Sequence, residues 1–142
     1  MANQIYNSFK RDIMNGSIDL DTDEINVMLV TSAYTPDVDV HDKRDDVTNE
    51  VANGNGYATG GAALAGKAVT ADNTDDEGMF DANDLTWAAS TITARGAVLY
   101  KARGGAASAD ELIAYIDFGS DKISSAGNFT IQWASEGILN LN

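Results

Sequence analysis

The only histidine of the chain, His41, lies in a polar segment with Asp37, Asp39 and Asp42 close by. A Ser/His/Asp triad or a two-histidine metal site needs further groups that converge on the imidazole, and a single loop histidine gives little sign of them. A general base is usually held by packing, and this segment offers little to pack. We therefore expect His41 to be structural or solvated.

Residues 19–23 read Asp-Leu-Asp-Thr-Asp, the spacing that opens a calcium-binding loop. The sixth loop position, which favours glycine, is Glu24, and the twelfth, which favours a bidentate glutamate, is Val30. We interpret this segment as a solvated acidic turn that also caps the start of a strand, with weak adventitious cation binding as the alternative.

A second acidic segment, residues 72–78, is followed by Asp81 and Asp84. Glycoside hydrolysis would need two carboxyl groups fixed about 5–10 Å apart across a sugar-binding cleft. With carboxylates this abundant, some pair meets that distance by chance. We predict a surface turn extended by charge repulsion, and cation binding remains an alternative.

Glycines and tryptophans raise two further possibilities, a phosphate cradle and a sugar-stacking platform. The glycines of residues 54–56 and 60–61 are not followed by a Lys-Ser pair or a helix start, so we interpret them as turn glycines with positive φ. Trp87 and Trp133 lie inside alternating segments, where an indole is more often a core anchor than a sugar platform.

Composition limits the classes of partner. The 142 residues are enough for one domain, 1–142, and there is no cysteine to form disulfides or thiolate sites. Acidic side chains outnumber basic ones by 22 to 9, for a formal net charge of −13. No nucleic acid and no membrane is therefore expected as a partner, and no cofactor is expected. The chain shows no secretion signal, so we expect synthesis in the cytosol of its producer.

The first third of the chain predicts a helix, a strand and a long loop. Residues 1–16 predict a short N-terminal amphipathic helix, with Ile5, Tyr6, Phe9 and Ile13 at helical spacing. Residues 25–30 form an apolar, β-branched run that predicts a strand covered on both faces. Residues 33–61, hereafter the excursion, carry turn and loop residues, with one possible short strand at 47–51.

The rest of the chain predicts strands at regular spacing. They are expected at residues 62–70, 79–82, 85–88, 93–101, 112–118, 129–133 and 138–141. Leu112, Ala114, Ile116 and Phe118 are expected on one face of a strand, and Phe129, Ile131 and Trp133 on one face of the next. The connections are too short for crossover helices, so the class is mainly β, an antiparallel sandwich or barrel.

Several segments together resemble small structural proteins of tailed bacteriophages. They are residues 5–10, 18–23 with 27–31, 46–51, 56–57 with 60–61, 80–82 with 86–87, 93–97 and 116–119. The resemblance spans nearly the whole chain, although these residues mark a fold and not a reaction. It implies a jelly-roll-like antiparallel β-sandwich and a virion component, chiefly a capsid decoration (cement) protein on the outer capsid surface, and not an enzyme.

The partners implied are the major capsid protein lattice and further copies of the chain, after synthesis in the bacterial host cytoplasm. The alternative is a tail or fibre module that recognises a host-surface glycan, and a hydrolase is the third hypothesis. A strongly acidic protein suits the outer face of a shell better than the face packed against DNA. The motifs do not separate head from tail placement, and they leave oligomeric state and host open.

The excursion is the longest part of the chain without a core pattern, and loops of this length are usually functional or disordered. Its tyrosines and its two charge signs suit a contact with a neighbouring subunit, while a loop that only covers one end of the sandwich is the alternative. The residues predicted to make this interface are Tyr34, Pro36, Lys43, Arg44 and Tyr57.

Overall fold

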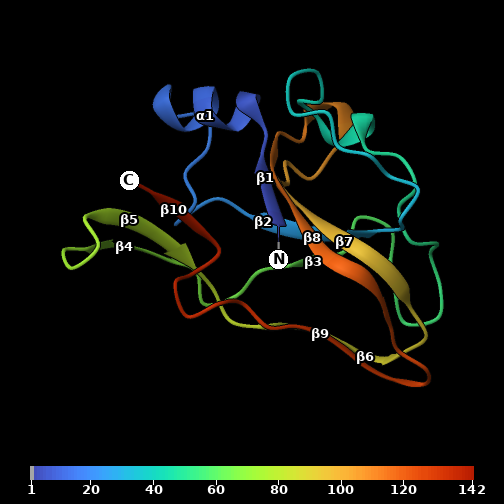
Figure 1. The fold of residues 1–142 in the computed structure, drawn as a ribbon. Helices are drawn as coiled ribbons and strands as arrows, with labels where there is room; N and C mark the ends of the chain where they lie inside the picture. The colour runs from blue at the N-terminus through green and yellow to red at the C-terminus, as the bar shows by residue number, and fades with distance from the viewer. Residues whose placement is uncertain (1) are drawn as a thin grey trace.

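The computed structural model describes residues 2–142 and has ten strands, one α-helix and two short 3-10 helices (Figure 1). The helices are α1 (Asn7–Met14), η1 (Arg44–Asp46) and η2 (Ala107–Ala109). The strands are β1 (Ala2–Ile5), β2 (Ile25–Val30), β3 (Ala62–Ala63), β4 (Ala68–Asp72), β5 (Glu77–Asp81), β6 (Leu85–Ser90), β7 (Thr93–Lys101), β8 (Leu112–Ile123), β9 (Gly127–Ile131) and β10 (Leu139–Leu141).

All paired strands are antiparallel, which confirms the mainly β class with one short N-terminal helix. One sheet has five strands in the order β1-β8-β7-β2-β3. A three-stranded sheet, β10-β5-β4, and the β6–β9 pair lie against it, and the main core lies between these layers. This strand order does not establish the jelly-roll part of the prediction.

The expected helix over residues 1–16 is shorter than predicted. Residue 1 lies outside the described residues, and Ala2–Ile5 form strand β1, with Ile5 opposite Ala114 of β8. The helix begins at Asn7 and ends at Met14, before the predicted stop at Asn15 and Gly16, where Gly16 has a φ of +79°. A pairing with a strand more than 100 residues away in sequence replaces the first helical turn, and helical spacing cannot reveal it.

Most predicted strands are present, with four corrections. The predicted strand 62–70 is divided into β3 and β4, which belong to different sheets, and Trp133 lies beyond the end of β9 at Ile131. The segment 47–51 forms no strand and makes one isolated bridge, Val30 with Glu50. In β8, Leu112 does not share a face with Ala114 and Ile116, because the register shifts between Leu99 and Tyr100 and inserts a β-bulge. Leu112 therefore packs on the second face of the sheet.

The five-stranded sheet is buried on both faces, as the apolar run of β2 predicts. One face packs on the main core, which includes Phe9 of α1, Trp87 of β6 and Trp133. The opposite face carries a second cluster with Met28, Tyr100 and Tyr115, and Tyr34 packs into it. The excursion therefore supplies the second cover of the sheet.

Candidate functional site

The excursion is anchored to the fold by Tyr34, which is 4% exposed. The Tyr34 hydroxyl lies 2.8 Å from the Tyr6 hydroxyl and 3.0 Å from His41 Nδ1. Nδ1 also accepts the backbone N–H of Asp37 at 3.2 Å, so it is the unprotonated ring nitrogen. Burial raises the pKa of Tyr6 and of Tyr34. His41 therefore has a structural place, in a buried hydrogen-bonded chain with two neutral tyrosines.

Tyr57 is a second anchor, 3% exposed and packed on the main core. Its hydroxyl accepts the backbone N–H of Leu29 at 3.0 Å and donates to Glu50 Oε1 at 2.7 Å. Burial raises the pKa of Tyr57 well above its ordinary value. The prediction that Tyr34 and Tyr57 supply exposed contact area is wrong, because both rings are part of the protein's own core.

Arg44 anchors the charged segment of the excursion to the rest of the fold. Its Nε donates to Asp110 Oδ2 at 2.8 Å, its backbone N–H donates to the Asp110 carbonyl at 2.9 Å, and its guanidinium lies 5.1 Å from the centre of the Tyr100 ring. Asp110 is 2% exposed and lies 66 residues further along the chain. No local signal in the sequence predicts this pair.

Asp46 fixes the turn before η1. Its Oδ2 accepts the backbone N–H groups of Asp42 at 2.9 Å and Lys43 at 3.1 Å, and the first of these bonds lowers the pKa of the Asp46 carboxyl. The Lys43 side chain makes an open pair with Asp42, with Nζ 3.6 Å from Oδ2. Arg44 is thus mainly structural, and Lys43 and Pro36 are the two predicted interface residues left partly exposed without a comparable anchor.

The outer surface of the excursion is exposed and largely polar. Its exposed large apolar side chain is Val40, which is 70% exposed at the tip, between Asp39 and His41. Asp39 Oδ1 accepts Asn7 Nδ2 at 2.7 Å, and the Val38 carbonyl accepts the Asn7 backbone N–H at 3.0 Å. The tip is therefore fixed against the start of α1, and both lie at the top of Figure 1.

The two acidic segments are turns, as predicted. Asp19 Oδ1 accepts the backbone N–H of Asp21 at 3.0 Å, and Asp23 pairs with Lys101 at 2.8 Å. In the β4–β5 hairpin, carboxylate oxygens of Asp72, Asp75 and Glu77 lie within 4.8 Å of one another. The glycines at 54, 56, 60 and 61 have positive φ, as expected. At Gly61 a Cβ atom would stand 1.8 Å from the Val27 carbonyl oxygen, so only glycine fits beside β2.

The tryptophans are core residues, 6% and 8% exposed, as expected. Trp133 Nε1 donates to the Asn83 carbonyl at 3.0 Å. Neither indole therefore offers a face for sugar stacking, which removes the support these residues gave to the glycan-binding alternative.

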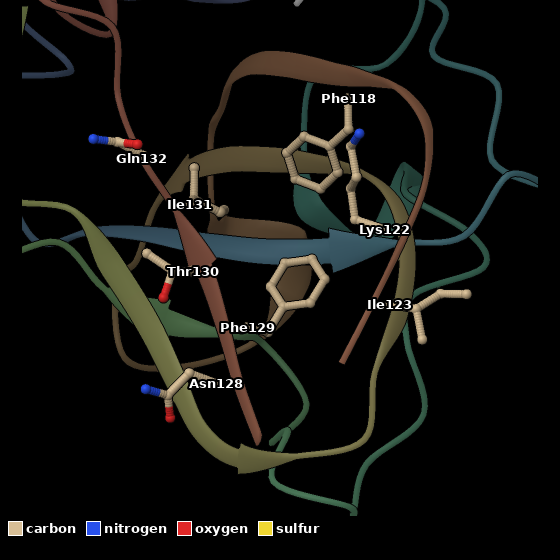
Figure 2. A pocket seen from close by; sticks show the side chains of 8 residues that line it. All are labelled: Phe118, Lys122, Ile123, Asn128, Phe129, Thr130, Ile131 and Gln132. Carbon is tan, nitrogen blue, oxygen red and sulfur yellow. The ribbon is translucent and has the colours of Figure 1, made fainter. Parts of the chain in front are cut away.

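Several hollows open on the surface of residues 2–142. One, of about 570 Å³, lies between β8 and β9. Figure 2 shows the rings of Phe118 and Phe129 facing this space, while Asn128 and Gln132 point away from it. The ring centres are 6.2 Å apart, so the floor of this groove is the edge of the core. The polar side chains do not converge in it.

The second groove, of about 760 Å³, lies between α1 and the β10-β5-β4 sheet, and we call it the α1 groove. Its lining is mostly apolar and includes Phe9, Ile13, Val69, Phe80 and Leu141. An exposed apolar groove on a small acidic protein marks an interaction surface. No local pattern in the sequence predicts this groove, because its walls come from three distant segments.

No protein-family model, curated protein or solved structure matches this chain. Within residues 2–142, none of the helices has the length and apolar character needed to cross a membrane.

Proposed function

We propose that this chain is a structural protein of a bacteriophage virion, specifically a capsid decoration (cement) protein that binds the outer face of the capsid lattice and stabilises the head. This proposal rests on the sequence resemblance together with one structural observation, which is that the surface of the excursion is held in place by the fold. Buried tyrosines and the Arg44–Asp110 pair hold this long loop in place, and its outer side carries Lys43 and exposed carboxylates.

A surface that is already ordered supports binding, since association then costs less conformational entropy. Each contact can be weak, because a lattice presents many equivalent sites and many bound copies stabilise it together. The net charge of −13 favours the outer side of a DNA-filled shell. The partners proposed are therefore the major capsid protein and neighbouring copies of the chain, with assembly in the bacterial host cytoplasm.

Copy number tests this function. Quantitative mass spectrometry of purified virions from the phage that encodes the chain should give a fixed ratio to the major capsid protein, of the same order as one. A few copies per particle would contradict head decoration and favour a tail or fibre position. Absence from purified virions would overturn the virion proposal as a whole.

A further inference from the structure

The α1 groove exposes one face of the β10-β5-β4 sheet. Residues paired across an antiparallel ladder share a face, and here Val69 and Leu139 both pair with Phe80, while Leu141 pairs with Gly78. Phe80 and Leu139 are buried, at 2% and 7% exposed. Val69 and Leu141 are 52% and 68% exposed. The core therefore covers one end of this apolar face and leaves the other end open.

Gly78 makes the open end hollow. It lies in the middle strand of the sheet, and a Cβ atom built on it would meet only the Leu141 carbonyl oxygen, at 3.9 Å. A glycine between larger neighbours leaves room for a side chain from outside. The hollow has room for a large apolar group that would contact Leu141 on one side and Ala71, the β4 partner of Gly78, on the other, with Val69 one pair further along the same face.

Carboxylates lie in the wall of this groove and beyond its sheet. Asp72 and Glu77 form the pair that follows Gly78 toward the tip of the hairpin, so their side chains lie on the opposite face of the sheet, and Asp75 completes that group. Asp19 and Asp21 line the opposite wall. Lys10 also lines the groove, where its Nζ donates to Asn7 Oδ1 at 3.1 Å, so the lining carries two carboxylates against one ammonium group. This excess of negative charge favours the approach of a cation.

We propose that the α1 groove binds an extended basic segment of a partner protein, with a large apolar side chain over Gly78 and a Lys or Arg beside Asp19 and Asp21. A second copy of this chain is the wrong occupant, because each copy carries a net charge of −13. The inference rests on the proposed function for the identity of that partner, the capsid protein. The groove lies along α1, whose first residue contacts the excursion, so the two surfaces adjoin.

The direct test is an NMR titration of the full chain with three synthetic peptides. One alternates lysine with leucine and tryptophan, the second replaces its lysines with glutamate, and the third replaces its apolar residues with serine. We expect the first peptide to shift the amide signals of Gly78 and Leu141 and to bind at least tenfold more tightly than the other two. Equal binding of the lysine–serine peptide would reduce the effect to general charge attraction and overturn the inference.

Substitutions test whether the peptide binds in the α1 groove. G78V should fold, since strands favour valine and nothing obstructs the new side chain, and it should abolish peptide binding by filling the hollow. L141S should weaken binding, and I123S is its matched control, because Ile123 is 72% exposed in the other groove. Binding by G78V at wild-type affinity would overturn the inference.

Binding to phage particles that lack the chain distinguishes this inference from the proposed function. Purified wild-type protein should bind them, and G78V should be bound at less than a tenth of the wild-type occupancy. If G78V decorates them fully, the proposed function stands and the α1 groove is not the contact. If virions do not contain the chain but the peptide results hold, the groove binds a basic segment of some other protein and the virion proposal fails.

Discussion

At the residue scale, Arg44 and Lys43 are neighbours in sequence with different environments. The Arg44 side chain is 19% exposed and its Asp110 partner 3%, whereas Lys43 and Asp42 are 28% and 47% exposed. A charge pair loses most of its value in water, while a buried carboxylate that loses its partner keeps the full cost of desolvation. The two cations therefore contribute unequally to stability.

We predict that R44A lowers the free energy of unfolding by about 2 kcal/mol, because Asp110 then stays buried without its charged donor. The matched control, K43A, should change it by less than about 0.5 kcal/mol. Urea unfolding followed by tryptophan fluorescence measures both. Equal effects of the two substitutions would show that the Arg44–Asp110 pair does not anchor the excursion.

Also at the residue scale, the hydrogen bonds of the acidic turns lead to a prediction about cations. Asp19 and Asp23 already accept backbone N–H groups, Asp23 also pairs with Lys101, and Asn140 donates to Glu77. Their carboxylates are therefore satisfied in part without an ion. A chelator should leave the melting temperature of the isolated protein unchanged, and a fall of about 10 °C or more would reveal a structural cation site.

At the scale of elements, the excursion is a cover for the sheet and not a mobile arm. The backbone N–H of Val51 donates to the Leu29 carbonyl at 2.9 Å, and that of Leu64, just beyond it, to the Ile25 carbonyl at 2.9 Å. Together with Arg44, these bonds tie the loop to β2 and to the start of β8.

Hydrogen exchange tests this description. The amides of Arg44 and Val51 should exchange about as slowly as those of β2, since opening them requires the excursion to leave the sheet. The amide of Asn53, in the exposed part of the loop, is the internal control and should exchange fast. Fast exchange at Arg44 and Val51 would mean that the excursion is a flexible arm.

The sequence predicted the elements whose signal is local and failed where distant partners decide. Strand β7 has the expected bounds, 93–101, because its apolar segment is continuous, buried at residues 96–100, and ends before the turn glycines 104 and 105. The predicted helix bounds are wrong because residues 2–5 pair with β8 as strand β1. The predicted face of Leu112 is wrong because the residues around a β-bulge carry no local sequence signal for it.

The interface residues show the same limit. Tyr34 and Tyr57 are predicted as interface residues because tyrosines supply contact area at low entropic cost, but Tyr34 covers the far face of the sheet and Tyr57 packs in the main core. The uncovered face can be recognised only when the order of the strands in the sheet is known. The α1 groove was missed for a related reason, since its walls meet only in three dimensions.

At the scale of the whole molecule, stability should depend on pH through carboxylates whose pKa values the fold lowers, among them Asp46, Glu111 and Asp117. Backbone N–H donation by Asp42 lowers the pKa of Asp46, the Arg103 side chain lowers that of Glu111, and the Arg95 side chain lowers that of Asp117. In the acid range the unfolded chain therefore binds more protons than the folded one, so stability rises with pH.

This contribution is fully present above the ordinary values of 3.8 for aspartate and 4.5 for glutamate, and it is lost as pH falls below them through the lowered folded values. The urea midpoint should change little between pH 7 and pH 5 and fall clearly by pH 3. A midpoint at pH 3 equal to that at pH 7 would contradict the assigned pairs.

The central claim is that many copies of this chain cover the outer face of a capsid. A cryo-electron microscopy reconstruction of the purified virion, at a resolution that shows strands, tests it most directly. We predict density for the fold of residues 2–142 at repeated lattice positions on the outer surface, with α1 and the excursion facing the capsid protein. Density confined to the tail or its fibres, or a capsid surface free of this fold, would contradict the claim.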